Sequence, residues 1–163
     1  MNILAFKKLL VLSLVALLTV LLAACDSGKR VLTSSGEFIN LLPTENSYLL
    51  LNYWADWCLP CKEEIPELNQ LHQTSKKHNV AVLGVNYDAL VGSALEEQIV
   101  RMGIEFPVLV EDPRSMFGFL EPEVLPMTVL VDSDGKVAKV LVGPQTLEGI
   151  EIELEVLRTP ESF

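Results

Sequence analysis

The sequence has little positive charge, and almost none of it is clustered. Its 163 residues include 12 Lys and Arg against 22 Asp and Glu, which gives a formal net charge of −10 at pH 7. No run of Lys or Arg is longer than two residues. A protein that binds nucleic acid needs clustered positive charge to neutralise the phosphate backbone. Nucleic acid is therefore excluded as an expected partner.

Histidine is scarce, and the motifs for phosphate binding and serine hydrolysis are missing. The two histidines, His72 and His78, stand in one expected helix, and we interpret both as surface residues. A metal site would need further Cys or His at ligand spacing, and we expect none. There is no Gly-rich phosphate loop and no Gly-X-Ser-X-Gly elbow, so nucleotide binding and serine hydrolysis lack support. The sequence predicts neither a metal nor a cofactor.

The remaining composition is that of one globular domain. Hydrophobic residues make up 50% of the chain and charged residues 21%. These fractions exclude a disordered or collagen-like chain, and the length suits one domain better than two.

The N-terminal segment has the layout of a secretory signal. Lys7 and Lys8 carry its only charges, and the stretch 9–22 that follows is almost wholly aliphatic. A helix that crosses the hydrocarbon core needs about 20 apolar residues, so this stretch is short for a permanent span. We therefore expect cleavage after residue 24, with an uncleaved anchor as the alternative. Both place the later residues outside the cytoplasm, because the two lysines hold the N-terminus inside.

Positions 22–25, Leu-Ala-Ala-Cys, resemble the lipobox of bacterial lipoproteins, in which the cysteine sulfur receives a diacylglycerol. The resemblance implies a signal peptide at 1–24 and lipidation of Cys25. The stretch that follows is short and polar and contains Gly28, which suits a tether, so we expect a lipidated tether at 25–35 and a domain at 36–163. Asp26 resembles the signal that keeps lipoproteins of many Gram-negative bacteria in the inner membrane. The expected location is the bacterial cell envelope, with the protein lipid-anchored to the outer face of the cytoplasmic membrane and its domain in the periplasm.

The chain after the tether alternates between expected strands and helices. Apolar runs predict strands at 48–54, 80–86 and 106–110, and helical spacing predicts helices at 59–78 and 90–102. Ser133-Asp134-Gly135 predicts a hairpin between strands at 127–132 and 136–142. The segment 147–157 fits both a strand and a helix, and analogy at the level of the fold favours the helix.

The remaining cysteines form one Cys-X-X-Cys motif. Cys58 follows an expected strand and stands at the N-terminus of the helix predicted at 59–78, where unpaired backbone N–H groups and the helix dipole favour a thiolate. Cys61 lies one turn further and is placed to resolve a mixed disulfide. Pro60 falls in the first helical turn, where its missing N–H costs nothing. A purely structural disulfide is the alternative, and the flanking Trp57 and Pro60 argue against it.

Two segments resemble the thioredoxin superfamily. The sequence Trp-Ala-Asp-Trp-Cys-Leu-Pro-Cys-Lys at 54–62 resembles its active-site signature, and Pro66 falls where that family kinks its active-site helix. The sequence Leu-Pro-Met-Thr-Val-Leu-Val-Asp at 125–132 resembles its cis-proline strand. The resemblance extends over about residues 36–157.

Within the superfamily, the sequence is most similar to the TlpA/ResA-like group of membrane-tethered, extracytoplasmic disulfide reductases. Three features carry this similarity: Asn52 in place of a buried Asp, Glu-Glu-Ile-Pro at 63–66, and a long segment between Val80 and Pro126. The resemblance implies an α/β domain with the thioredoxin-like fold. Its expected architecture is three α/β/α layers around a mixed central sheet, with the TlpA-like central insertion.

The resemblance also implies the roles of the site residues. Cys58 is the expected nucleophile and Cys61 the resolving cysteine, and the two form the redox-active disulfide. Pro126 is the expected cis-proline beside Cys58, where it helps to hold the substrate. Trp57 and Pro60 complete the expected site, with Trp57 covering its surface.

The surroundings of the motif are less well determined by the sequence. We interpret the nearby charged residues as solvated: Lys62, Glu63 and Glu64 on a helix face, and Asp56, Glu121 and Glu123 at the rim. The loop 120–125 lacks the glycine that the group places before its cis-proline, so it is expected to be stiffer and more acidic. Asn52 cannot accept a proton as a carboxylate does, which leaves the proton acceptor for Cys61 unidentified.

The expected function is extracytoplasmic thiol–disulfide exchange on protein disulfide substrates. The resemblance implies reduction, with electrons from a membrane donor of the DsbD or CcdA type that often pass to apocytochrome c in cytochrome c biogenesis. A disulfide oxidase of the DsbA type is the first alternative, although Leu59-Pro60 lacks the histidine typical of that class. A Sco-like copper-delivery protein is the second, although no histidine follows His78. A peroxiredoxin would need a Thr-X-X-Cys site, which is missing.

Overall fold

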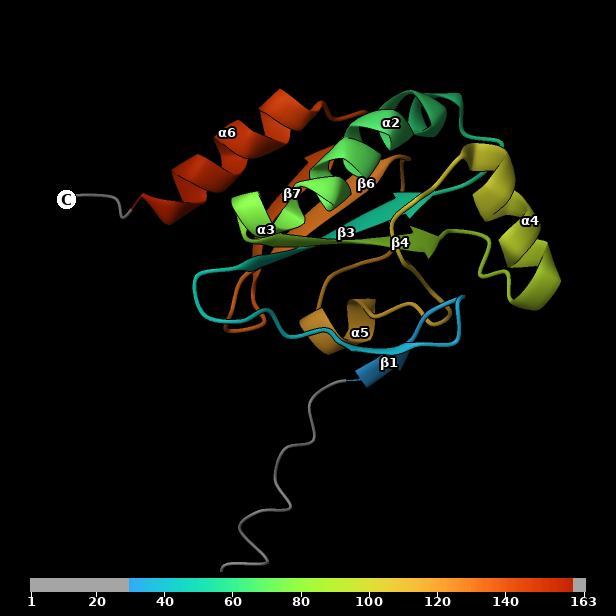
Figure 1. The fold of residues 1–163 in the computed structure, drawn as a ribbon, viewed down its shortest axis with the longest axis horizontal. Helices are drawn as coiled ribbons and strands as arrows, with labels where there is room; N and C mark the ends of the chain where they lie inside the picture. The colour runs from blue at the N-terminus through green and yellow to red at the C-terminus, as the bar shows by residue number, and fades with distance from the viewer. Residues whose placement is uncertain (1–29, 160–163) are drawn as a thin grey trace, which may run out of the picture.

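The computed structural model describes residues 30–159, which fold around a five-stranded mixed sheet (Figure 1). The sheet has the strand order β5-β4-β3-β6-β7. Its strands are β3 (Tyr48–Trp54), β4 (Val80–Asn86), β5 (Val108–Leu109), β6 (Met127–Val131) and β7 (Val137–Val142). The neighbours β3, β4 and β5 run parallel, whereas β6 is antiparallel to both β3 and β7.

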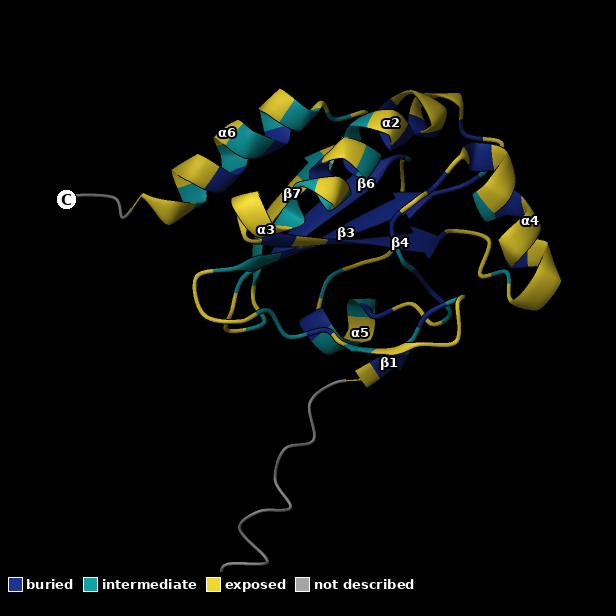
Figure 2. Cartoon of the chain, in the orientation of Figure 1, coloured by how far each residue is buried: buried dark blue, intermediate teal, exposed yellow. Residues whose placement is uncertain are grey.

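Alternation along β3 divides the interior into two cores. Leu50 and Trp54 face one side of the sheet, and Leu49 and Leu51 face the other. Helices cover the first face: α2 (Leu59–Gln73), α4 (Gly92–Met102) and α6 (Leu147–Arg158), with the short α3 (Ser75–His78) following α2. The second face is covered by α5 (Arg114–Phe117) and by the hairpin of β1 (Arg30–Leu32) and β2 (Phe38–Asn40). Figure 2 shows the buried strands between these two layers.

The expected three-layer architecture with a mixed sheet is confirmed, and so is the long insertion. The segment between β4 and β6 contributes α4, β5 and α5, and β5 extends the sheet at its edge. Gly84 of β4 allows Trp54 and Phe106 to pack closely against the strand. A Cβ at position 84 would lie 2.9 Å from the indole nitrogen of Trp54 and 3.0 Å from the ring of Phe106.

Every predicted strand and helix is present, with shifts of bounds in several of them and one interruption within a predicted helix. Strands 48–54 and 80–86 have the predicted bounds. The helix expected at 59–78 is interrupted at Thr74, whose hydroxyl donates to the Gln70 carbonyl at 2.8 Å while its backbone leaves the helical conformation. The ambiguous segment 147–157 is helical, and Thr146 accepts from the Gly149 N–H at 3.1 Å at its start.

The expectation that residues 25–35 form a tether is wrong for residues 30–35, which belong to the folded domain. Residues 30–32 form β1, which pairs with β2, and Val31 is buried in the second core. The Ser34 N–H then donates to the Val108 carbonyl at 2.8 Å. A tether has no such partners, so the folded unit includes residues 30–35. The expected signal peptide and Cys25 lie outside the described residues, and between residues 30 and 159 no helix has the length and apolarity to cross a membrane.

Candidate active site

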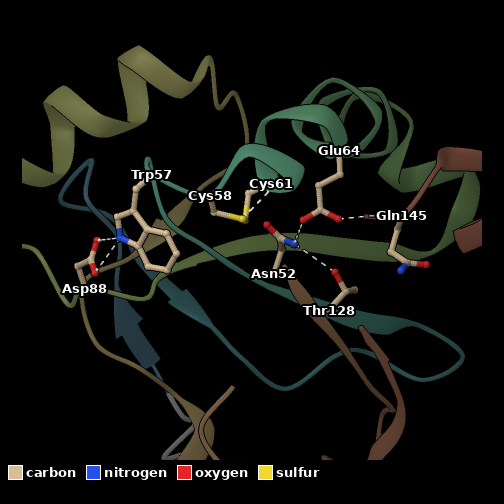
Figure 3. Close-up of a disulfide and its surroundings, with 8 residues drawn as sticks. All are labelled: Asn52, Trp57, Cys58, Cys61, Glu64, Asp88, Thr128 and Gln145. Atoms are coloured by element: carbon tan, nitrogen blue, oxygen red, sulfur yellow. Dashed lines mark hydrogen bonds between the residues drawn. A yellow bond between two sulfur atoms is a disulfide. The ribbon is translucent and has the colours of Figure 1, made fainter. Parts of the chain in front are cut away.

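Cys58 and Cys61 form a disulfide at the N-terminal end of α2, directly after β3 (Figure 3). Cys58 is the N-cap residue, and its sulfur accepts a hydrogen bond from the Cys61 N–H at 3.2 Å. The predicted position at a helix start is therefore confirmed. Once the disulfide is reduced, the same N–H groups favour a thiolate at Cys58. Cys61 is fully buried and Cys58 is 4% exposed, so the first cysteine lies nearer to solvent.

The two tryptophans of the motif have different surroundings, as predicted. Trp54 is fully buried in the first core. Trp57 is 62% exposed beside Cys58, and its indole N–H donates to the Asp88 carboxylate at 3.0 Å. The ring of Trp57 also meets Tyr87 edge-on, with ring centroids 6.2 Å apart. These two contacts hold an apolar side chain at the surface next to the cysteine pair.

Pro126 follows a cis peptide bond with Leu125, as the sequence predicts. Pro126 is buried immediately before β6, and Leu125 packs against the core that contains Cys58 and Cys61. The loop thus reaches the core of the cysteine pair through Leu125. Direct contact between Pro126 and Cys58 stays a prediction.

Glu64 is not on a solvated helix face, and that interpretation of the sequence is wrong. Its side chain is 1% exposed, whereas Lys62 and Glu63 are exposed as expected. One oxygen of Glu64 accepts from the Asn52 amide at 2.6 Å, and the other accepts from the Gln145 N–H at 3.1 Å (Figure 3). The carboxyl therefore lies between α2, the middle of β3 and the loop before α6.

Helical spacing explains why Glu64 is buried. The buried face of α2 consists of Cys61, Ile65, Leu68 and Leu71. Glu64 lies one turn after Cys61 and one turn before Leu68, so it belongs to the same face. This spacing was the available signal for a buried carboxyl.

Burial raises the pKa of Glu64 to about 7, and the hydrogen bonds from Asn52 and Gln145 partly oppose that rise. A carboxyl in this range exchanges a proton near neutral pH. The structure thus places a group with the properties of a proton acceptor one helical turn after the buried Cys61. Sequence reasoning left this group unidentified.

Asn52 and Thr128 form the floor of the site on two adjacent strands. They are register partners in β3 and β6, and both are fully buried. Alternation places Asn52 on the face covered by α2, because Leu50 and Trp54 on either side of it face the same core. The Asn52 amide donates to Thr128 Oγ1 at 3.1 Å in addition to its bond with Glu64.

The acidic residues at the rim are partly neutralised by arginines. Asp56 lies 3.4 Å from Arg101, and Glu121 lies 3.0 Å from Arg114. Glu121 and Glu123 are exposed, which agrees with the predicted solvated rim, whereas Asp56 is half-buried. The loop before the cis-proline is therefore attached to α5 through Glu121.

The prediction that both histidines are surface residues is wrong for His78, whose side chain is largely buried. Its side chain is 13% exposed, and its ring nitrogen lies 3.1 Å from the Glu151 carboxylate. His72 is partly exposed. Among residues 30–159, no three His, Cys, Asp or Glu side chains gather in a way that would hold a metal ion.

Comparison with known proteins places the chain in a family. A family model described as "AhpC/TSA family" matches residues 28–140. The chain belongs to the AhpC/TSA family. The match includes the cysteine motif, Glu64 and the cis-proline.

The chain is also similar to curated proteins and to solved structures. "Thiol-disulfide oxidoreductase ResA" of Bacillus thuringiensis (strain Al Hakam) is 31% identical over 116 residues, 71% of this chain. The match covers 66% of that relative, so the chain spans about two thirds of its length. StoA from Bacillus subtilis has a TM-score of 0.63 at 23% identity, over 77% of this chain and 94% of its own.

A crystal structure of a putative thiol:disulfide interchange protein DsbE from Chlorobium tepidum has a TM-score of 0.58 at 28% identity. It covers 78% of this chain and 89% of its own. Together with StoA, it confirms the thioredoxin-like fold that the sequence resemblance implied.

The buried carboxyl predicts a pH-dependent stability. The pKa of Glu64 in the folded state lies above its ordinary value of 4.5, so the folded state holds this proton more tightly than the unfolded state does. The protonated Glu64 therefore adds to the free energy of unfolding in full below pH 4.5, and this addition is lost as the pH rises through about 7. In the oxidised protein the free energy of unfolding should fall by up to about 3 kcal/mol over this pH range because of Glu64. We expect Glu64→Gln to abolish that part of the fall, since glutamine does not titrate. Urea denaturation across this pH range measures the decline.

The neighbouring Glu63→Gln is the matched control, because Glu63 is exposed on the same helical turn. It should leave the pH dependence close to that of the unsubstituted protein. An equal decline in the Glu64→Gln and unsubstituted proteins would contradict the assignment of the buried titrating group.

Proposed function

We propose that the protein is a thiol–disulfide oxidoreductase that reduces protein disulfides through Cys58 and Cys61. The observation that carries the proposal is the Cys58–Cys61 disulfide at the start of α2, with a buried carboxyl one turn further along the helix. Relatives named thiol-disulfide oxidoreductases support it.

The proposed reaction has two exchange steps. The Cys58 thiolate attacks one sulfur of the substrate disulfide and forms a mixed disulfide, while the other substrate sulfur leaves as a thiolate. The Cys61 thiol then loses its proton and attacks the Cys58 sulfur, which releases the second substrate thiol and leaves the Cys58–Cys61 disulfide. Because Cys61 is fully buried, its proton needs an acceptor inside the protein. Glu64 fills that role, with a pKa raised to about 7.

The remaining site residues position the substrate in this proposal. Trp57 offers an exposed apolar surface beside Cys58. Pro126 holds the substrate backbone next to the disulfide, and Pro60 starts the helix that activates Cys58.

Catalysed reduction of insulin by dithiothreitol tests the function. The protein from Asp26 onward should accelerate the reaction, because Cys58 stands at a helix N-terminus and lies nearer to solvent than Cys61. Cys58→Ser should lower the rate to the uncatalysed level, and Cys61→Ser should accumulate a mixed disulfide on Cys58. No acceleration by a correctly folded protein would reject the proposal, and a lasting mixed disulfide on Cys61 in Cys58→Ser would reverse the two roles.

The direction of electron flow is the second point to test. Without residues 1–24 the chain has 10 Lys and Arg against 22 Asp and Glu, a net charge of −12 that opposes a thiolate and offsets the helix N-terminus. We therefore expect a reduction potential nearer to about −270 mV, as in thioredoxin, than to about −120 mV, as in DsbA. A glutathione redox titration measures it. A value at or above about −150 mV would favour the oxidase instead.

We further propose lipid anchoring at Cys25 to the outer face of the cytoplasmic membrane. A domain there depends on a dedicated electron supply, because a bacterial periplasm is kept oxidising. A membrane donor of the DsbD or CcdA type fits this need, and apocytochrome c is a candidate substrate. The lipobox-like sequence before Cys25 supports the anchor.

Processing at Cys25 is open to direct measurement. Cys25→Ala should leave an uncleaved precursor, since the modified sulfur marks the cleavage site. Mass spectrometry of the native protein should find an acylated N-terminal Cys25. Peptides from residues 1–24 on the mature protein would show an uncleaved anchor instead.

A further inference from the structure

The amide oxygen of Asn52 is a buried acceptor without a donor. Asn52 is fully buried, and no donor between residues 30 and 159 forms a hydrogen bond with its Oδ1 atom. An unpaired carbonyl oxygen in a protein interior costs free energy, so such atoms are rare and often belong to a redox or catalytic function.

The direction of this oxygen is fixed by the other half of the amide. Asn52 Nδ2 carries two N–H groups, and both have acceptors: Glu64 Oε1 at 2.6 Å and Thr128 Oγ1 at 3.1 Å. The oxygen must therefore point away from these two side chains. Figure 3 shows it turned toward the cysteine pair. Alternation along β3 and the helical spacing of Cys61 and Glu64 place Asn52 and Cys61 on facing surfaces of the same core.

Cys61 needs an acceptor in one redox state only. In the disulfide its sulfur carries no hydrogen, so it cannot donate to Asn52. When two glutathione molecules reduce the protein, the Cys58–Cys61 bond breaks, one glutathione disulfide forms and a hydrogen is added to each protein sulfur. The new thiol of Cys61 is buried, and the unpaired Asn52 Oδ1 is turned toward the cysteine pair that contains this thiol (Figure 3).

We infer that the Cys61 thiol donates a hydrogen bond to Asn52 Oδ1 in the reduced protein, so that Asn52 stabilises the dithiol form and positions the resolving cysteine. This inference rests on the proposed redox function. The oxidised form leaves the oxygen unpaired and the reduced form pairs it. Asn52 therefore increases the equilibrium constant for reduction by glutathione.

Asn52→Leu tests the effect on that equilibrium, because leucine has a similar shape and no acceptor. The substitution also removes a donor from Glu64, so a second pair of proteins is compared, Glu64→Gln alone and Glu64→Gln with Asn52→Leu. A glutamine there carries no charge at any pH. In both backgrounds we expect the equilibrium constant to fall about tenfold, which corresponds to a potential lower by about 30 mV.

Thr128→Val is the matched control for the loss of a hydrogen bond that holds the Asn52 side chain in place. It removes one acceptor of Asn52 Nδ2 and leaves Oδ1 in place. The equilibrium constant of Thr128→Val for reduction by glutathione should stay within about twofold of that of the starting protein, whereas Asn52→Leu should change it about tenfold. An Asn52→Leu constant equal to that of the starting protein, with insulin reduction intact, would overturn the inference and leave the proposed function standing.

Infrared spectroscopy tests the bond without substituting Asn52. The full chain with Cys25→Ser and Cys58→Ala, kept in detergent, retains Cys61 as its single thiol. Its S–H stretching band should lie at lower frequency than in the same protein unfolded in urea, because a donated hydrogen bond weakens the S–H bond. The assignment of Asn52 as the acceptor would be contradicted if the folded protein showed no shift relative to the unfolded one. It would also be contradicted if the same shift to lower frequency persisted after Asn52→Leu.

Discussion

The buried carboxyl of Glu64 is the constraint on which the arrangement of this site depends. A carboxyl with 1% of its surface exposed needs partners, and here they come from distant parts of the chain: the Asn52 amide in β3 and the Gln145 N–H before α6. Glu67, one turn further along α2, adds a similar bond by accepting from the Leu147 N–H at 2.9 Å. Helix α2 cannot move along the sheet without breaking these bonds. The positions of the cysteines at its start are fixed by the same contacts.

The features that the sequence predicted well are local ones. The bounds of β3 and β4 follow from continuous apolar runs, because central parallel strands are buried on both faces. Cys58 at the helix start follows from the strand before it and the proline two residues after it. The cis bond before Pro126 follows from a motif of adjacent residues. In each case the decisive residues stand within one turn or one strand.

The features that sequence reasoning missed depend on partners far along the chain. Glu64 lies within an apolar helical stripe, but a charged residue is normally assigned to the surface, and its acceptor bonds come from residues 12 and 81 positions away. His78 was assigned to the surface for the same reason, although Glu151 lies across from it in α6. Residues 30–35 continue a short polar stretch and are therefore expected to belong to a tether, because their pairing with β2 and with β5 becomes visible only in the folded chain.

The two cysteines occupy different electrostatic environments although only two residues separate them. Cys58 accepts from the backbone at the N-terminus of a helix, and such groups favour a thiolate near the surface. Cys61 lies fully buried in an apolar core, and burial favours its neutral thiol. The rim does not reverse this difference, since Asp56 and Glu121 each face an arginine. This difference supports the proposed role of Cys58 as the sulfur that attacks the substrate. In the proposed reaction the Cys61 sulfur keeps its proton until the mixed disulfide has formed on Cys58, and loss of that proton then allows Cys61 to attack the Cys58 sulfur and release the substrate thiol.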